Sequence, residues 1–518
     1  MVWLEKNRTQ LITIGVLILL FLLAIQSMPA DDWVVTTLRG LSTGAMIFLV
    51  AAGLSIIFGL MDVLNLAHGE LFMIGAYVAW TMYVRPDTVL DALTPVALVA
   101  AGLVLVPVWR AGLVRRFSLS PRLARAWPWV ALLLGGALIG YLLASYPISA
   151  WSLENFQLSP VTYSVALENG LEQIPAPVPF AIAPPLLLAG LVLGSGLLSF
   201  GLAGLTAHRV HSRQSRQQRR HTLALAALLF VSAFALLAVN NPLTEYLFSL
   251  STTMRFLIAV LVATMAGILL GAIIEILLIR PLYERPIYQI MMTLGIGFIA
   301  VELVRAVWGR SEVSIPRPAL FAGTGDACPA ANLADLFAHH CSTYLLFDAR
   351  VRVYNEFFLT LVGFIILILM TLLLQRTRLG IIIRAGVEDS KMVEAMGIDV
   401  QRVFTLVFAL GAGLAALGGA LAGVALGLSN DMGLRVLLLA LIALAIGGLT
   451  SFPGAAAGAL LVGLLQQFII KYGQIGIQLP FMAEPFKPSP PLVPASTILL
   501  MVVILLLLPQ GLFGQKES

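Results

Sequence analysis

Long apolar runs separated by short polar stretches dominate the chain. A run of roughly 17–25 apolar residues can cross a bilayer as a helix, and about fourteen runs qualify. They lie near residues 11–29, 38–60, 66–84, 95–109, 128–146, 183–204, 222–239, 254–279, 288–308, 356–375, 403–428, 435–449, 453–470 and 494–508. These runs are too long for membrane strands and lack a period of two. We therefore expect an all-α, polytopic transmembrane helix bundle of about fourteen spanning helices.

Composition agrees with a protein that lives in the bilayer. Hydrophobic residues make up 59% of the chain, charged residues 11%, and the mean hydropathy is +0.97. A soluble domain carries about 25% charged residues and could not bury so much apolar surface. The first run, 11–29, has flanks that resemble a signal peptide, but its apolar part exceeds the roughly 7–15 residues of such a core. We expect a retained helix there.

The basic residues predict the orientation of the chain. Short loops rich in Lys and Arg stay in the cytoplasm. Such stretches are Trp109–Trp127, His208–His221, Arg280–Pro286 and Gln375–Lys391. With a cytoplasmic amino terminus, all four fall inside, as does the carboxyl-terminal GQKES, so both termini are predicted to be cytoplasmic. His208–His221 could instead bind anionic lipid or nucleic acid, but topology accounts for it and no nucleic-acid partner is expected.

The only two cysteines, Cys328 and Cys341, lie in a long loop, 309–352, that this topology puts outside. An oxidising exterior permits a disulfide between them. The neighbouring HHC at 339–341 lacks the further ligands that a zinc site needs, so no metal site is expected.

Three motifs that carry chemistry are absent from the sequence. It contains no GxxxxGK[ST], HExxH or CxxC, and the pattern GxSxG occurs once, as GLSTG at 40–44 inside an apolar run. The absent patterns carry phosphate binding, zinc hydrolysis and redox chemistry. We therefore expect no enzyme activity and no cofactor, and a polytopic chain of this kind is by default a transporter, channel or receptor.

A polar stretch between two apolar runs predicts a short helix on the cytoplasmic surface. The stretch begins with RAGVEDSKMVEAMGID. Acids and Ser390 suit a helix start, and Gly397 suits a left-handed helix end. Small apolar side chains with an acidic rim suit docking into a groove on a soluble partner, although an ordinary solvated loop is the alternative. The candidate coupling residues are Arg384, Glu388, Asp389, Met392, Glu394, Ala395, Met396 and Gly397.

A second polar stretch, NLAHGELFMIGAY from Asn65 to Tyr77, interrupts the apolar pattern. Irregular backbone at membrane depth is tolerated only where protein or a water-filled cavity covers it, and transporters use such breaks at their substrate paths. Asn65, His68, Gly69 and Glu70 are therefore candidates for a helix break or the translocation pathway. The alternative is that the preceding helix ends at the cytoplasmic surface and these residues cap and turn it.

Small residues and charged pairs suggest packing and anchoring roles. Glycines four apart let helices approach closely in lipid, and the candidates for helix packing are Gly419, Gly423, Gly427, Gly454 and Gly458. Thr450 or Ser451 can cap the helix expected at the apolar run 453–470. Glu275 lies near Arg280 at the inner boundary and favours an anchoring role. Glu302 and Arg305, three apart, can pair.

Five ordered blocks resemble a known family. They are GLSIIFGLMDVLNLAHGELFMIGAY, EILLIRPLYERP, RAGVEDSKMVEAMGI with the following VFALGAGLAALGGALAG, IGGLTSFPGAAAGALLVG and LLPQGLFG. They resemble the H-type permease subunit of ABC importers for branched-chain amino acids. The resemblance covers residues 37–85 and 254–514. It implies a permease core at 37–85 and 254–518, an extra amino-terminal helix in 1–36, and an insertion of about four helices at 86–253.

The resemblance also implies a function and partners. The chain is expected to be an inner-membrane permease subunit that translocates branched-chain amino acids by alternating access. Two cytoplasmic ATPase subunits would dock on Val387–Gly397, with a second permease chain, an extracytoplasmic solute-binding protein and membrane lipid as further partners. A permease for urea, amides or another small solute is one alternative. A self-sufficient secondary transporter is another, but it predicts paired intramembrane acids and an inverted repeat, and neither is evident in the sequence.

Overall fold

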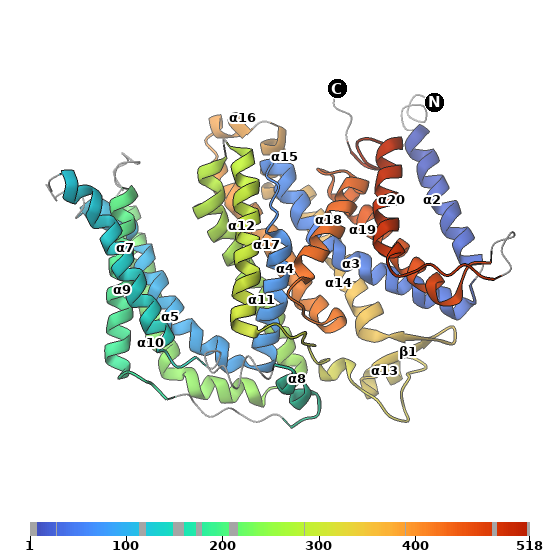
Figure 1. Cartoon of the computed structure of the whole chain (residues 1–518), viewed down its shortest axis with the longest axis horizontal. Coiled ribbons are helices and arrows are strands. Elements are labelled where there is room, and N and C mark those ends of the chain that lie inside the picture. Colours follow the sequence, from blue (N-terminus) through green and yellow to red (C-terminus); the bar gives the residue numbers. More distant parts are fainter. Residues whose placement is uncertain are drawn as a thin grey trace. The chain divides into compact units, whose positions relative to one another are not determined.

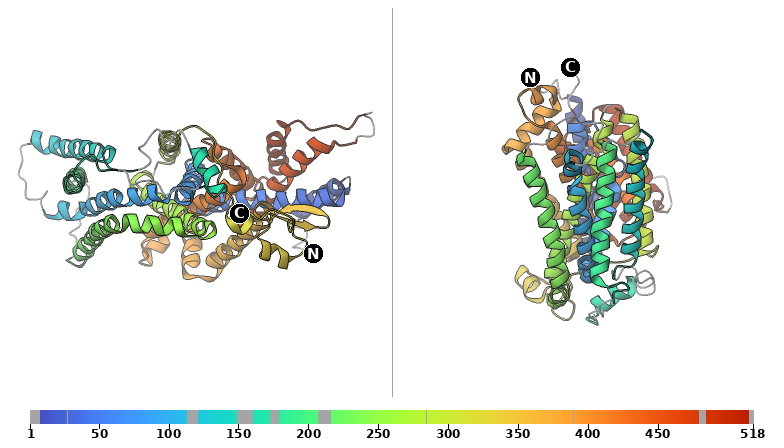
Figure 2. Two further views of the ribbon diagram at one scale, coloured as in Figure 1. Left: turned by 90° about the horizontal axis from the view of Figure 1, so that it is seen from below. Right: turned by 90° about the vertical axis from the view of Figure 1, so that its left-hand side faces the viewer.

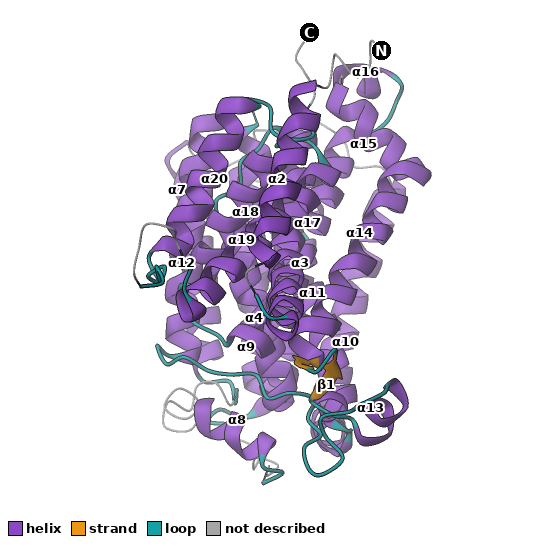
Figure 3. Ribbon diagram, turned by 90° about the vertical axis from the view of Figure 1, so that its right-hand side faces the viewer, coloured by secondary structure: helices purple, strands orange, loops and turns teal. Residues whose placement is uncertain are grey.

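The computed structural model describes residues 8–26, 28–112, 121–148, 160–171, 179–206, 216–283, 285–388, 390–478 and 484–514 (Figure 1). The chain forms two compact units, one of Met1–Trp80 with Thr252–Ser518 and one of Thr81–Ser251. Helices make up nearly all of the described elements, with two short strands (Figure 3). The predicted all-α, polytopic class is therefore confirmed.

The first unit contains most of the helices. Its α-helices are α2 (Arg8–Gln26), α3 (Ala30–Met61), α4 (His68–Val84, which ends just past the unit boundary), α11 (Thr252–Ile274), α12 (Pro286–Trp308), α13 (Leu333–His339), α14 (Leu359–Arg376), α15 (Arg378–Glu388), α16 (Ser390–Ala395), α17 (Val400–Leu426), α18 (Met432–Gly447), α19 (Phe452–Ile475) and α20 (Leu492–Leu507). Four short turns accompany them: η3 (Glu275–Ile279), η4 (Arg280–Leu282), η5 (Ala319–Phe321) and η6 (Val353–Phe358).

Each of the fourteen predicted apolar runs overlaps at least one helix. Among the described residues, ten helices are long and apolar enough to cross a membrane. Apolar segments of α2, α18 and α20 are shorter, and α4 has 17 residues. The structure therefore supports a polytopic bundle, while the count of fourteen spans stays a prediction.

Helix α3 forms the core of the first unit, because 78% of its apolar window is buried. Its glycines allow this. A Cβ atom on Gly40 or Gly44 would lie 2.9 or 3.0 Å from the backbone of α19. Close approach of helix backbones through small residues is the usual packing device in lipid. Because α3 already begins at Ala30, the predicted boundary at residue 36 falls inside this helix.

The predicted packing glycines divide into two groups. Gly419 lies against Phe72 of α4, whereas Gly454 and Gly458 lie against the end of α18, so these three pack between helices. Gly423 instead faces Ile315 in the loop before η5. The packing role was wrong for Gly427. Helix α17 ends at Leu426, and Gly427 has a φ of 76°, so it terminates the helix in a conformation that glycine adopts without strain.

The two ends of the first unit differ in character (Figure 1). Helices α15 and α16 lie at one end, and α13 lies with a small hairpin at the other. The hairpin pairs β1 (Thr343–Leu346) with β2 (Ala349–Arg352) in antiparallel register. Both residues of its turn, Phe347 and Asp348, have positive φ, as two-residue hairpins prefer. Cys328 and Cys341 form a disulfide in the same loop.

The second unit is a separate helical bundle. Its helices are α5 (Pro86–Val104), α6 (Val106–Gly112), α7 (Pro121–Ala144), α8 (Pro160–Glu168), α9 (Pro184–Thr206) and α10 (Arg216–Ser249). The long helices lie side by side, with α9 between α5 and α7 (Figure 2). A buried ion pair joins Arg85 to Asp87 at 2.8 and 3.0 Å, and the Arg85 guanidinium lies 4.5 Å from the Tyr163 ring centre.

Candidate functional site: a coupling segment and a buried helix break

Helices α15 (Arg378–Glu388) and α16 (Ser390–Ala395) cover most of the predicted surface helix. Asp389, between them, lies outside the described residues. Helix α16 ends as predicted, because Gly397 has a φ of 84° and its N–H donates to the Glu394 carbonyl at 2.9 Å. A left-handed glycine is the usual helix end of this kind.

Helix α16 presents two faces. Val393 is buried, whereas Met392 and Met396 are 64% and 62% exposed. Glu394, Ala395 and Gly397 are exposed as well. Flexible methionines with an acid beside them form an adaptable contact surface. This exposed face of α16, from Met392 to Gly397, is called the coupling face below.

Arg384 has a different position from the rest of the predicted coupling set. It lies on α15, and its guanidinium donates to the Leu374 carbonyl near the end of α14. It also lines a cavity of about 350 Å³ between α3, α14, α15 and the start of α19. Arg384 therefore ties α15 to α14. Glu388 is the last residue of α15 and precedes the coupling face in the sequence.

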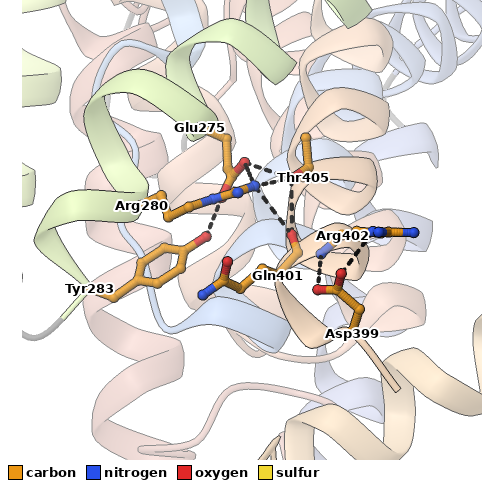
Figure 4. Close-up of polar contacts among 7 residues, drawn as sticks. All are labelled: Glu275, Arg280, Tyr283, Asp399, Gln401, Arg402 and Thr405. Atoms are coloured by element: carbon orange, nitrogen blue, oxygen red, sulfur yellow. Dashed lines mark hydrogen bonds and ion pairs between the residues drawn. The ribbon is translucent and has the colours of Figure 1, made fainter. Parts of the chain in front are cut away.

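The coupling face leads directly into α17. Asp399 caps this helix, since its carboxylate accepts a hydrogen bond from the Arg402 N–H at 3.3 Å. The two side chains also pair at 2.7 Å, both largely exposed (Figure 4). An Asp cap satisfies one of the free N–H groups of a helix start and suits its dipole. The start of α17 is thereby fixed a few residues after Gly397.

The fully buried carboxylate of Glu275, just after the end of α11, is hydrogen-bonded to the start of α17 (Figure 4). Glu275 accepts two hydrogen bonds from Arg280, from Nε to Oε1 at 3.1 Å and from Nη2 to Oε2 at 2.9 Å. The Tyr283 hydroxyl donates to Oε1, and the Thr405 hydroxyl of α17 donates to Oε2 at 2.7 Å. Bidentate arginine–carboxylate pairs are strong and fix geometry. We refer to Glu275, Arg280, Tyr283 and Thr405 as the brace.

The backbone explains why Glu275 and Arg280 can meet at a spacing of five. Residues 275–279 form a π-helical turn, in which the Arg280 N–H donates to the Glu275 carbonyl. Single π turns are frequent at functional positions. Burial raises the pKa of the Tyr283 hydroxyl, and its hydrogen bond to Glu275 raises it further. Tyr283 therefore remains a proton donor to the carboxylate at physiological pH.

The second candidate region is the break between α3 and α4. Helix α3 ends at Met61, Asp62 follows with a φ of 49°, and an irregular segment that ends in a turn leads to His68. Asn65 and His68 have no exposed surface. The Asn65 side-chain oxygen accepts from the Ala67 N–H at 3.1 Å, and its backbone carbonyl accepts from the His68 N–H at 3.2 Å. Asn65 therefore organises the start of α4.

The break lies deep inside the helix bundle. A Cβ atom on Gly53 would lie 2.7 Å from Nε2 of His68, and it would also meet the Gly411 carbonyl. Gly53 is about eight residues from the end of α3, and Gly411 about eleven from the start of α17, which is roughly 12–16 Å along either helix. That is about half of a hydrocarbon core of about 30 Å. His68 therefore lies well inward from the end of α3, which favours the helix-break interpretation over a surface cap.

A second helix begins at the same level. Gly433, the second residue of α18, faces the start of α4: a Cβ on it would lie 2.7 Å from the Gly69 carbonyl and 2.5 Å from Oε2 of Glu70. Helix α4 runs along α17, with Ala79 next to Ala420. The first turns of α4 and α18 thus meet inside the first unit, and Glu70 lies between them.

Polar atoms in this break are poorly satisfied. Nδ2 of Asn65, both ring nitrogens of His68 and Oε2 of Glu70 are buried without a well-formed hydrogen bond, although the Val50 backbone lies near the His68 ring. Helix α12 supplies one contact, since the Thr293 hydroxyl accepts from the Leu66 N–H at 3.2 Å. Buried polar groups without partners are uncommon, and each calls for a functional or structural reason.

Sequence reasoning found part of this arrangement. It singled out Asn65, His68, Gly69 and Glu70, which the structure brings together at one helix start. It missed Gly433 and Thr293, which complete the break, and Tyr283 and Thr405, which complete the brace. Thr293 and Thr405 have partners 227 and 130 positions away, which no local pattern reports. Tyr283 lies only eight positions from Glu275, but the π-helical turn that brings them together has no signal in the sequence.

The fold and the buried break define a multi-pass helical membrane protein with an interrupted helix of the kind that transporters use. The chain belongs to the family described as "Branched-chain amino acid transport system / permease component", whose model matches residues 36–109 and 219–508.

Three relatives carry related names. The chain is 30% identical over 158 residues to the high-affinity branched-chain amino acid transport system permease protein LivH of Escherichia coli K12, which covers 30% of this chain and 46% of LivH. It is 33% identical over 165 residues to BraD of Pseudomonas aeruginosa, which covers 32% and 49%. It is 30% identical over 164 residues to a probable LivH of Methanocaldococcus jannaschii, which covers 30% and 47%. The chain therefore spans about half the length of the curated relatives it matches. No solved structure matches it.

Proposed function

We propose that the chain is the membrane permease subunit of an ABC importer, located in the inner membrane, that translocates branched-chain amino acids by alternating access. The observation that carries this proposal is the continuity from the coupling face of α16 through the Asp399 cap to the brace. A surface loop without a binding partner would not require the buried Glu275–Arg280 ion pair beside the helix that follows it. Membership of the permease family and the names of LivH and BraD support the substrate class.

The proposed partners follow the two ends of the first unit. Two ATPase subunits hydrolyse ATP and dock on the coupling face, which makes that end cytoplasmic. The hairpin end then faces outward, toward an extracytoplasmic solute-binding protein. A second permease chain completes the complex, and membrane lipid surrounds it. In this arrangement both termini are cytoplasmic and about fourteen helices span the bilayer.

We also propose that residues 86–253 are an insertion into a permease core of 37–85 and 254–518. Two observations support it. The family model leaves residues 110–218 unmatched, and Thr81–Ser251 forms a compact unit of its own. The unmatched stretch is narrower than the proposed insertion, so α5 and α10 are the parts of it that the family model covers.

Co-purification of a tagged chain from its native membrane tests the importer, with ATP hydrolysis measured on the eluate. We expect ATPase subunits in the eluate and several-fold stimulation by leucine-loaded binding protein. Stimulation by a urea- or amide-loaded protein alone would leave the importer standing and overturn the substrate. An eluate without ATPase subunits in mild detergent would contradict the importer and favour a secondary transporter.

A double variant tests the coupling face separately. Glu394→Arg with Met396→Asp changes exposed side chains only, so we expect the chain to insert normally but to lose its ATPase subunits. The matched control is Asp348→Arg with Phe347→Asp at the exposed hairpin turn, which should keep them. Normal ATPase yield from the coupling-face variant would refute the docking assignment.

A further inference from the structure

Glu70 is an acid that the brace and the coupling face do not use. It lies in the first turn of α4 and is 7% exposed. Within the part of the chain that the structure describes, its Oε2 atom has no hydrogen-bond partner. A buried donor or acceptor without a partner costs about 1–3 kcal/mol, and more when it is charged. A group that carries such a cost at the centre of a transport protein requires an explanation.

Two glycines make the space that the carboxylate occupies. A Cβ on Gly433 of α18 would lie 2.5 Å from Oε2, and a Cβ on Gly297 of α12 would lie 3.6 Å from Cγ. The side chain of Glu70 therefore lies between α18 and α12. The first turns of α4 and α18 both lie beside it, and the free N–H groups and dipoles of helix starts stabilise a negative charge.

Helix α12 covers Glu70 but is itself little buried in the first unit. Only 17% of its apolar window is buried. Its buried residues form one stripe of polar and small side chains that faces the break: Gln289, Thr293, Gly297, Ala300 and Val304. Its other faces are apolar and exposed, with Met291 and Phe298 at 65% and 68%. A helix with lipid-compatible outer faces and a polar inner stripe suits the border of a solute path.

We propose that Glu70 is the acceptor that binds the N–H donors of the transported solute, reached when α12 separates from α4 and α18. The inference rests on the proposed function and deepens it. The shared chemistry is a small solute with a cationic ammonium or an amide N–H group, because a carboxylate with a free oxygen pairs with either. In the structure, Oε2 of Glu70 lies against Gly433 and the Cγ of the same side chain lies near Gly297.

The test uses the assembled complex in proteoliposomes that contain ATP, with loaded binding protein outside. Glu70→Gln keeps the shape of the side chain and removes its charge. We expect at least a tenfold loss of leucine uptake with the yield of the assembled complex within twofold of the unchanged protein. General collapse of the bundle would lower uptake and yield together. Leucine uptake within twofold of normal in the glutamine variant overturns the proposal.

Matched glycine variants sharpen the result. Gly433→Ala directs a methyl group at Oε2 and should reproduce the uptake loss. Gly295→Ala, on the same helix α12, meets nothing within 4 Å and should be close to normal. If the glutamine variant does not assemble, Glu70→Asp decides, since it keeps the charge and withdraws the carboxylate by one methylene. Normal uptake by an assembled aspartate variant overturns the proposal, and a tenfold loss supports it.

Parallel uptake of leucine and of urea or a short amide separates the two solute classes. Glu70-dependent leucine uptake assigns the ammonium group as the ligand. Glu70-dependent uptake of the amide alone assigns the amide, and only the substrate in the proposed function then fails. If the unchanged complex transports no solute of either class, the proposed function fails and this inference falls with it.

Discussion

The brace and the helix break are both buried and polar, yet different interactions stabilise them. In the brace, Glu275 is surrounded by donors from Arg280, Tyr283 and Thr405, and both carboxylate oxygens are paired. In the break, Glu70 has an oxygen without a partner. The brace is held by hydrogen bonds and charge, whereas the break is held by backbone packing around glycines.

This difference fits two mechanical roles. A fully paired network resists separation, because each lost contact leaves a charge or a donor buried without a partner. The brace can therefore transmit movement from α17 to α11 as a rigid unit. The buried polar groups of the break that lack partners raise the free energy of this arrangement. A rearrangement that lets water or solute reach them would lower that free energy. The break is thus suited to be the part that opens.

Breaking the brace should produce the largest effect. In Glu275→Ala the guanidinium of Arg280 loses its carboxylate partner and keeps the Thr405 hydroxyl and the Gln401 carbonyl as acceptors. We expect the apparent free energy of unfolding in detergent to fall by roughly 3 kcal/mol. Denaturant titration of the purified chain measures this change. The matched control is Glu302→Ala, which removes an exposed partner of Arg305 paired at 2.6 Å. An exposed pair contributes about 0–1 kcal/mol, so equal losses in the two variants would contradict the role of the brace.

Sequence patterns predicted the elements better than their contacts. Apolar run lengths located the helices, and the nearness of Glu275 to Arg280 indicated an anchor. Thr405 could not be predicted, because it lies 130 positions from Glu275 and no single-sequence pattern reports on such a distance.

Similar limits apply to the break. The polar stretch around Asn65 marked an interruption, but run lengths alone left its depth open, and only the contacts of Gly53 and Gly411 locate it. Gly427 was assigned to packing because the small-residue spacing continues past Leu426. The spacing says nothing about backbone dihedral angles, and these end the helix there.

Packing at the break should produce the next largest effect. A Cβ on Gly419 would collide with the Phe72 carbonyl of α4, so Gly419→Ala must displace one helix. We expect a loss of about 2 kcal/mol in unfolding free energy, in the range of overpacked cores. Gly295→Ala on α12 is the control, because a methyl group there meets nothing within 4 Å. It should be neutral or stabilising by up to about 1 kcal/mol, the difference in helix propensity between the two residues. A tolerated alanine at Gly419 would show that backbone contact does not hold α4 in place.

The smallest effect should come from trimming one donor of the brace. Thr405→Val removes the hydroxyl that donates to Oε2 of Glu275 at 2.7 Å and keeps the shape of the side chain. The expected loss is about 1 kcal/mol, because Arg280 and Tyr283 still pair the carboxylate. Thr264→Val is the control, since that hydroxyl donates to the Val260 carbonyl within its own helix and its loss should be nearly neutral. Combining Thr405→Val with Glu275→Ala then tests whether Thr405 and Glu275 act as one network. If they do, the double variant loses less unfolding free energy than the sum of the two single losses. Additive losses would mean that Thr405 stabilises α17 on its own and that movement passes from α17 to α11 without it.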